Sequence, residues 1–184
     1  MKTIWTTTPT AFLAVVVITL LFAVGATGAS TPAVQKILPA KDSVKGFGIV
    51  AGSLQYAKGA DLTKIYNGAV DLYTGNGVLA AARQLYQRKN DYVEVTVHEM
   101  KSEKAALDFL NYWKKEHGVK SLTKTKTSSS FVVTKPSCMG YTVVGKYFAT
   151  VSALYSSDSA KNDVKSFMKV VEKKTIDLTK ESSR

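Results

Sequence analysis

Four side chains between residues 66 and 73 are the best suited in this sequence to recognise a ligand, namely Tyr66, Asn67, Asp71 and Tyr73. Asn67 and Asp71 are four positions apart, so they would share one face of a helix. One hypothesis is a polar recognition cluster for a ligand. The alternative is that both tyrosines are half-buried in the core and that Asn67 pairs with a nearby backbone group, as is usual for aromatic side chains at helical spacing.

The histidines and the cysteine do not form a pattern typical of a catalytic or metal site. Glu99 follows His98, but Ser102 occupies the position where the zinc-protease motif H-E-x-x-H needs its second histidine. His98, His117 and Cys138 lie far apart in the sequence, and two solvent-facing histidines are the simpler interpretation. We therefore predict no catalytic residue, no metal and no cofactor, in a protein that is not an enzyme.

The chain carries a formal net charge of +11, and most of the excess lies in its second half. From residue 111 to 184 there are 14 basic residues against 6 acidic ones. Lys165, Lys169 and Lys173 recur every four positions and could present a basic face to an anionic lipid or polymer, although a solvated lysine face is the simpler interpretation. Arg184 is the only arginine in this half, so the bidentate base contacts of nucleic-acid readers are not expected.

The first 29 residues have the order of a secretory signal. A positive start at Met1-Lys2 precedes an apolar run of 16 positions, Ala11–Ala26, and small residues follow that run. The run is shorter than the ~20 residues that cross a bilayer comfortably. We predict cleavage after Ala29 or Ala26 and export to the periplasm, the cell surface or the extracellular space. The alternative is an uncleaved N-terminal anchor, which would be the protein's one link to a membrane.

Cys138 is the only cysteine in the chain, so an internal disulfide cannot form. We expect a buried and inert thiol at the start of a strand. The alternative is an intermolecular disulfide, which would require Cys138 to be exposed.

The spacing of apolar residues predicts one α+β domain over residues 47–176. The predicted strands are 47–56, 79–88, 92–100, 131–133, 141–144 and 147–151, and the predicted helices are 61–73, 102–117 and one that starts near residues 156–158. Short connections favour a mainly antiparallel sheet with about three helices packed on it. Strands 79–88 and 92–100 should form a hairpin with one buried face. Residues 30–46 are predicted to be a tether and residues 177–184 a frayed tail.

Three motifs occur together in this chain: Leu62 to Tyr73 with Ile65-Tyr66-Asn67-Gly68 inside it, the passage from Tyr92 to Ala106, and a late Gly145-Lys146-Tyr147-Phe148 hairpin. Together they resemble a family of exported prokaryotic proteins, many of them lipoproteins, that is classed as a domain of unknown function. Its usual motif is L-Y-x-Y-I-N-G-x-A-x-L-Y. The resemblance covers roughly residues 47–175 and implies the α+β fold and export, but no activity. The lipid-anchoring cysteine of the family is absent here.

The sequence thus predicts an exported, non-enzymatic domain that binds a small ligand or another component of the cell envelope between its sheet and its helices. The first alternative is a basic surface domain that binds anionic lipid or an envelope polymer through its lysines. A hydrolase is the third hypothesis, and no constellation of residues supports it.

Overall fold

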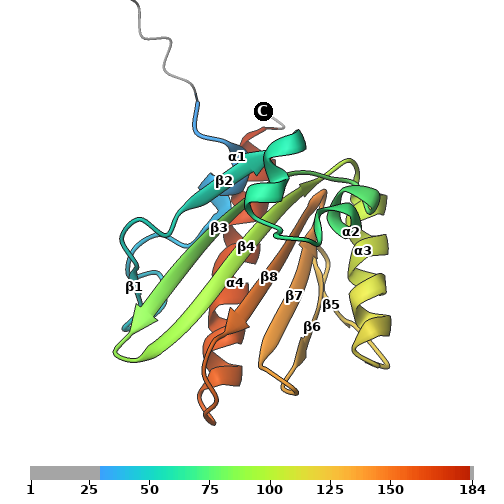
Figure 1. Cartoon of the computed structure of the whole chain (residues 1–184). Helices are drawn as coiled ribbons and strands as arrows, with labels where there is room; N and C mark the ends of the chain where they lie inside the picture. Colours follow the sequence, from blue (N-terminus) through green and yellow to red (C-terminus); the bar gives the residue numbers. More distant parts are fainter. Residues whose placement is uncertain (1–29, 183–184) are drawn as a thin grey trace, which may run out of the picture. The chain divides into compact units, whose positions relative to one another are not determined.

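An antiparallel sheet of eight strands is the centre of the described chain (Figure 1). The computed structural model describes residues 30–182, so the predicted signal segment, residues 1–29, lies outside the described residues. The strands are β1 (Gly48–Ile49), β2 (Gln55–Lys58), β3 (Val78–Arg88), β4 (Asp91–Met100), β5 (Thr123–Lys124), β6 (Ser129–Val133), β7 (Met139–Val144) and β8 (Tyr147–Ala153). Their order across the sheet is β1-β3-β4-β8-β7-β6-β5, and β2 also pairs with β3. The predicted α+β class with a mainly antiparallel sheet is confirmed.

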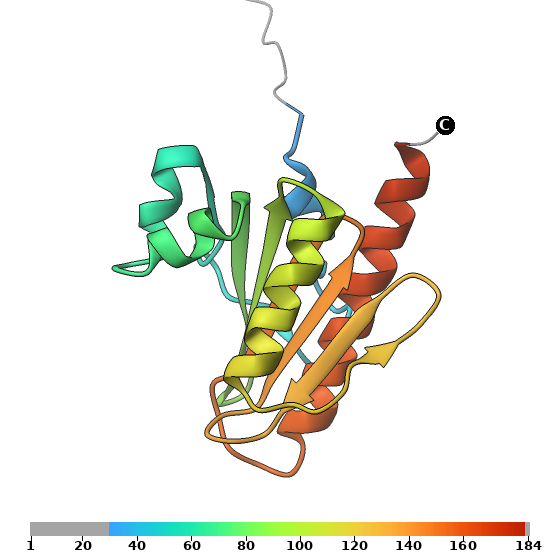
Figure 2. The same ribbon diagram turned by 90° about the vertical axis from the view of Figure 1, so that its right-hand side faces the viewer.

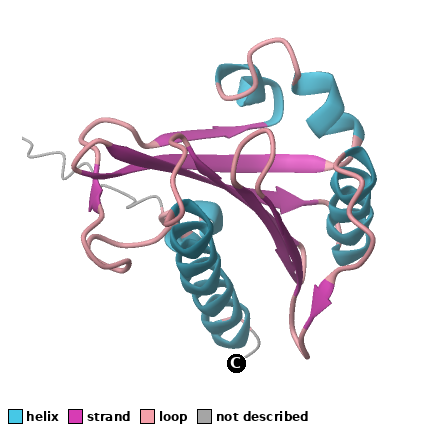
Figure 3. Ribbon diagram, turned by 90° about the horizontal axis from the view of Figure 1, so that it is seen from below, coloured by secondary structure: helices cyan, strands magenta, loops and turns pink. Residues whose placement is uncertain are grey.

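Helices cover both faces of this sheet (Figure 2). They are α1 (Ala33–Ile37), the 3₁₀ helix η1 (Gly59–Lys64), α2 (Val70–Gly75), α3 (Glu103–Glu116) and α4 (Ala160–Glu181). Seen from below, α4 and α3 lie on opposite sides of the sheet (Figure 3). One buried cluster joins α1 and α4 to the first face, and another joins η1 and α3 to the second. The sheet is therefore the middle layer of three.

The hairpin of β3 and β4 forms as predicted, but it has two buried faces rather than one. Val93, Val95 and Val97 are fully buried on the α4 side. On the opposite side, Thr96 is 3% exposed and His98 is 1% exposed. The prediction of only one buried face is wrong because η1, α2 and α3 cover the other side. The alternation of residues in β4 does not indicate where these helices pack.

The single helix predicted over residues 61–73 is wrong, because the segment forms two short helices with a break between them. Gly68 lies in the break with a φ of +78°, a left-handed conformation that glycine adopts without steric cost. The break brings the rings of Tyr66 and Tyr73 into a stack with centroids 3.7 Å apart. In one continuous helix these residues would be about 10 Å apart along the axis, so they could not stack.

Both segments that were predicted to be loose outside the domain take part in the fold. Val34 and Ile37 of α1 lie in the predicted tether and are buried against the sheet and α4. The hydroxyl of Tyr86 in β3 also donates a hydrogen bond to the carbonyl of Pro39, at 2.8 Å. At the other end, α4 continues to Glu181 rather than fraying after residue 176. The helix α1 has only five residues, which is too few for the spacing of its apolar residues to predict it.

The helix predicted over 102–117 is confirmed, and its start is fixed by a side-chain cap. The Oγ atom of Ser102 accepts a hydrogen bond from the amide of Ala105 at 3.1 Å. No helix within residues 30–182 has both the length and the apolar character that a membrane crossing needs.

Candidate functional site

A cavity of about 310 Å³ lies on the sheet face opposite α4. It is lined by residues of β3, β4, β8 and β7 and by residues of the η1–α2 segment and the end of α3. We call it the aromatic pocket. Its floor is formed by Arg83, Glu94, Thr96, Met139, Thr150 and Ser152. Its aromatic and imidazole walls are formed by Tyr66, Tyr73, His98, Trp113, His117 and Tyr141.

Strand register brings the polar side chains of the floor side by side. Thr96 of β4 is paired with Arg83 of β3 on one side and with Thr150 of β8 on the other. Glu94 is paired with Ser152 in the next row on the same face. The Nε atom of Arg83 lies 3.5 Å from a carboxylate oxygen of Glu94 and 3.4 Å from the hydroxyl of Thr96. The floor therefore offers a positive group, a negative group and several hydroxyls within one small area.

The first wall is a stack of three nearly parallel rings. Tyr66 and Tyr73 stack at 3.7 Å with an angle of 12° between their planes. The imidazole of His98 is parallel to both within 12°, at 5.9 Å from Tyr66 and 5.7 Å from Tyr73. Tyr73 also meets Phe109 of α3 edge to face, which connects the α2 segment with α3. These contacts fix the positions of the rings.

The second wall comes from the last turn of α3 and from β7. The ring of Trp113 lies 5.8 Å from that of Tyr141 and 5.9 Å from that of His117. The Nε2 atom of His117 is 2.7 Å from the hydroxyl of Tyr141, which also donates weakly to the sulfur of Met139 at 3.5 Å. The hydrogen bonds of this wall are therefore made within the protein, except at the indole of Trp113.

Three buried polar atoms of the aromatic pocket have no hydrogen-bond partner. They are Oη of Tyr66, Nε2 of His98 and Nε1 of Trp113, and they are the only buried side-chain nitrogen or oxygen atoms of this kind in residues 30–182. All three residues line the same cavity. An unsatisfied buried polar atom costs about 1–3 kcal/mol, and most are therefore paired in folded proteins. Their concentration in one cavity marks it as the candidate site.

The hydrogen bonding of His98 fixes which of its nitrogens is an acceptor. Its Nδ1 atom lies 3.0 Å from the carbonyl oxygen of Phe148, which can only accept, so Nδ1 carries the proton. Burial lowers the pKa of His98 to about 4, although the hydrogen bond to the Phe148 carbonyl acts in the opposite direction. The ring is therefore neutral near pH 7, and its unpartnered Nε2 is an acceptor.

The tyrosines of the aromatic pocket stay protonated as well. Burial raises the pKa values of Tyr66, Tyr73 and Tyr141 above the usual range of a phenol. Within residues 30–182, no three potential metal ligands among His, Cys, Asp and Glu come together. The pocket thus combines neutral hydrogen-bonding groups with one carboxylate and one guanidinium, which is a composition suited to recognition.

Two of the four residues predicted to bind a ligand line the aromatic pocket, and two do not. Tyr66 and Tyr73 belong to its wall, whereas Asn67 and Asp71 are exposed and lie outside it. The expectation that the histidines face solvent is wrong for His98, which is 1% exposed because α3 and the tyrosine stack cover it. His117 is half-buried in the same cavity.

Several lining residues were not predicted, above all Arg83, Glu94, Trp113 and Tyr141. The alternation of polar residues Glu94, Thr96 and His98 in β4 is the available signal, but it also fits a hairpin with one solvent-exposed face. A row of polar residues on one strand has the same pattern whether it faces water or a cavity.

The predicted anionic-surface lysines divide between two hollows beside α4. Lys165 and Lys169 line a groove of about 410 Å³ between α4 and the β5–β6 segment, together with Lys161. Lys173 lies in the neighbouring hollow and pairs with Asp177 at 2.7 Å. Lys169 reaches both hollows.

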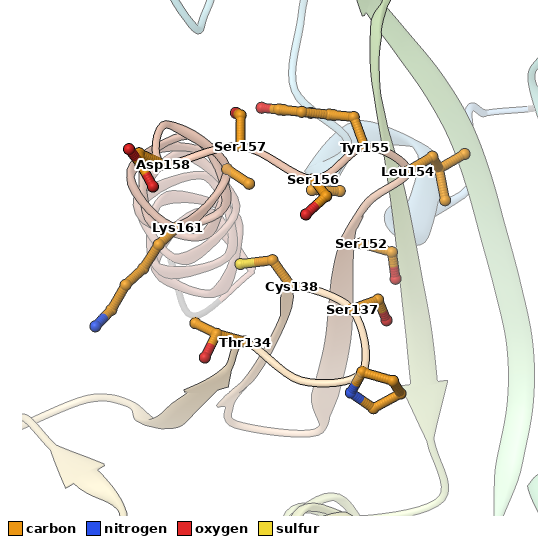
Figure 4. Close-up of a pocket in the computed structure, with 13 residues that line it drawn as sticks. Thr134, Ser137, Cys138, Ser152, Leu154, Tyr155, Ser156, Ser157, Asp158 and Lys161 are labelled. Atoms are coloured by element: carbon orange, nitrogen blue, oxygen red, sulfur yellow. The ribbon is translucent and has the colours of Figure 1, made fainter.

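A larger hollow, of about 760 Å³, lies between the segment before β7, the end of β8 and the start of α4 (Figure 4). Its labelled side chains are mostly hydroxyls, with Cys138 among them. Cys138 is 7% exposed, and Leu154 at the rim is 58% exposed. None of the buried atoms without a partner in residues 30–182 belongs to this hollow, so it is a weaker candidate than the aromatic pocket.

Comparison with known proteins gives no family for this chain. No protein-family model matches the sequence, and no curated protein matches it. Among solved structures, the extracellular domain of PknH from Mycobacterium tuberculosis is similar, with a TM-score of 0.48 and 12% sequence identity over 77% of this chain and 94% of that domain. The resemblance to an exported prokaryotic family therefore stays a prediction.

Proposed function

We propose that this protein is an exported, non-enzymatic domain that binds a small polar molecule in the aromatic pocket. The observation that carries the proposal is that three residues lining that one cavity each have a buried polar atom without a hydrogen-bond partner. A ligand that paired with Tyr66, His98 and Trp113 would recover a stabilisation that the folded chain alone lacks. Export rests on the order of charge, apolar run and small residues in the first 29 positions.

The architecture of the cavity supports binding by a preformed site. The floor belongs to four hydrogen-bonded strands, and both walls are held by ring contacts and by the bond between His117 and Tyr141. Small-molecule sites are usually concave, rich in aromatic side chains and supplied with a few directed polar groups. This cavity combines those three features, and its volume is at the lower end of the usual range of about 300–1,000 Å³.

The chemistry of the lining favours recognition over catalysis. Covalent catalysis requires a nucleophile activated by a neighbouring base. Within residues 30–182, the hydroxyls of Thr96, Thr150 and Ser152 have no hydrogen bond to a histidine or a carboxylate. The burial of His98 makes it a weak base. A pocket that holds its titratable rings neutral is suited to binding an uncharged ligand.

A matched pair of tyrosine variants tests the proposal. We expect Tyr66→Phe to leave the free energy of unfolding unchanged within about 1 kcal/mol or to raise it, because it removes an unpaired buried hydroxyl. The same variant should weaken the binding of a ligand found by screening a chemically diverse library of small molecules. Tyr56→Phe is the control, because Tyr56 lies in β2 outside the pocket and is 37% exposed. Equal affinities in wild type and Tyr66→Phe would contradict the proposal.

A second candidate function rests on the groove beside α4. Lys161, Lys165 and Lys169 line it in consecutive turns, and none of them has a carboxylate within 4 Å in the described part of the chain. The opposite side of the groove carries the hydroxyl side chains of Thr123, Thr125, Ser128 and Ser130. The lysines thus repeat about every 6 Å along the helix and face hydrogen-bond donors. This arrangement favours the binding of a linear anionic polymer of the cell envelope.

The basic groove is tested with polyphosphate as the probe. We expect binding to weaken steeply with salt and to be lost in Lys165→Glu/Lys169→Glu. The control Lys41→Glu/Lys115→Glu changes the net charge equally at exposed positions away from the groove. Binding that survives about 0.5 M salt, where the screening length falls to about 4 Å, would contradict this second function. Binding to anionic vesicles but not to polyphosphate would indicate that the partner is a membrane surface.

A further inference from the structure

The unpartnered atoms of the aromatic pocket require opposite properties of a ligand. The Nε2 atom of His98 can only accept a hydrogen bond, because Nδ1 holds the ring proton against the carbonyl of Phe148. The Nε1 atom of Trp113 can only donate, and the hydroxyl of Tyr66 can do either. A hydroxyl group donates and accepts at once, so a ligand bearing several hydroxyls can pair with all three atoms.

The floor of the cavity offers further hydroxyl groups with which a ligand could form hydrogen bonds. The hydroxyls of Thr150 and Ser152 line the cavity and form no hydrogen bond within residues 30–182. The hydroxyl of Thr96 receives only a long bond from Arg83, at 3.4 Å. Polar groups thus lie on the floor of the cavity as well as in its walls. A planar heterocycle, whose donors and acceptors lie on its rim, would leave most of this floor unpaired.

The charges of the floor favour a ligand without net charge. The guanidinium of Arg83 and the carboxylate of Glu94 lie 3.5 Å apart, and each is about 30% exposed. An anionic ligand would be attracted by the first and repelled by the second, and the reverse holds for a cation. Both groups can instead hydrogen-bond to neutral hydroxyls, the guanidinium as a donor and the carboxylate as an acceptor.

The walls suit the carbon face of such a ligand. The rings of Tyr73 and Trp113 offer apolar surface against which the C–H groups of a saturated ring can pack. Together with the cavity volume of about 310 Å³, these features limit the ligand to one or two small rings. We infer that the aromatic pocket binds a neutral, hydroxyl-rich ring, that is, a mono- or disaccharide. This inference rests on the proposed function and names its ligand class.

One tryptophan makes the inference directly measurable. The chain holds two tryptophans, Trp5 and Trp113. Trp5 lies in the segment whose cleavage the sequence predicts, so the mature protein holds Trp113 alone, and Trp5→Phe has the same effect in a chain that keeps this segment. Either form reports only from the pocket. The probes are a panel of neutral mono- and disaccharides that includes glucose and N-acetylglucosamine, the charged analogues glucuronate and glucosamine, and adenine as a planar heterocycle. The readout is the emission of Trp113, with calorimetry for the affinity.

We expect saturable changes of Trp113 emission with at least one neutral sugar and at least tenfold weaker binding of its charged analogues. Ser152→Ala in the same background should weaken sugar binding several-fold, whereas Ser166→Ala, on the exposed side of α4, should not. Saturation by adenine without any response to sugars would overturn the inference and leave the proposed function standing. No response to any probe would overturn the inference as well, and an unchanged Trp113 signal across the wider small-molecule library would count against the proposed function itself.

Discussion

The Nδ1 atom of His98 lies 3.0 Å from the carbonyl oxygen of Phe148, and this contact determines which nitrogen of the imidazole is left without a hydrogen-bond partner. The two residues are direct partners in the pairing of β4 with β8. The acceptor at Nε2 is therefore fixed by the register of the central sheet. Preorganised groups of this kind reduce the ordering that a ligand must impose when it binds.

The burial of His98 should make the stability of the protein depend on pH in the mildly acidic range. The folded pKa of about 4 lies below the usual value of about 6.5, so the unfolded chain takes up the proton first as the pH falls. The stabilisation from neutral His98 is complete above about pH 6.5 and is lost as the pH falls toward 4. Urea unfolding between pH 7.5 and 4.5 should show this decline. It should be smaller in His98→Gln and retained in His117→Gln, whereas equal slopes in both variants would contradict the assignment.

An ion pair that joins α4 to the β3–β4 hairpin should control stability at low pH. Arg88 donates to both carboxylate oxygens of Asp163, at 3.0 and 2.6 Å, and Tyr155 donates to the same carboxylate. Burial alone would raise the pKa of Asp163, but these hydrogen bonds lower it below its usual value. The resulting stabilisation is present above about pH 3.9 and is lost as the pH falls further through the folded pKa.

We therefore expect Asp163→Asn to lower the free energy of unfolding near pH 7 by about 1.5–3 kcal/mol, the range for hydrogen bonds to charged groups. It should also flatten the loss of stability between about pH 4 and 2. Asp71→Asn, at an exposed position in α2, should do neither. Denaturant unfolding monitored by circular dichroism measures both effects. An Asp163→Asn variant as stable as the wild type near pH 7 would show that the pair contributes nothing.

The approach of α4 to β7 depends on a glycine. A Cβ atom added at Gly140 would lie 2.2 Å from the sulfur of Met168 and 2.8 Å from a methyl group of Val164. We expect Gly140→Ala to lower stability by about 1–3 kcal/mol, because both side chains would have to move in a packed core. Gly75→Ala at the end of α2 has open space around its Cβ and should change stability by no more than about 1 kcal/mol. A destabilisation of similar size in both variants would refute the close packing of α4.

The thiol of Cys138 should react slowly in the folded protein. It is 7% exposed, and burial raises its pKa, so little thiolate is available for reaction. We expect labelling by a maleimide reagent to be at least tenfold slower in buffer than in denaturant, and non-reducing electrophoresis to show a monomer. Rapid labelling or a disulfide-linked dimer would support the exposed thiol that an intermolecular bridge requires.

The sequence was sufficient for the parts of the fold that depend on local pattern. The alternation of Val93, Val95 and Val97 identified β4, and Ser102 identified the start of α3 through its cap. It was insufficient at Gly68, because a glycine inside a helical period costs only about 1 kcal/mol and does not reveal a break. The stacking of Tyr66 on Tyr73 depends on that break.

Sequence analysis identifies only Tyr66 and Tyr73 among the residues that line the aromatic pocket, for a related reason. Its lining residues come from six separate stretches, including those of Tyr66, His98 and Trp113, and their proximity is set by strand register and by the packing of α3. The pattern of a single sequence does not indicate which elements cover which face of a sheet. The alternation in β4 therefore predicts a solvent-exposed face, whereas in the structure this face lines a cavity.

Native mass spectrometry of the protein, purified without denaturation, tests the central claim most directly. The account predicts that wild-type protein carries an additional mass in the range of one or two sugar rings, which dissociates on denaturation and is absent from a Tyr66→Phe/Trp113→Phe variant. A wild-type chain that carries no bound molecule, and whose Trp113 emission stays unchanged when the sugar panel and the small-molecule library are added, would contradict it.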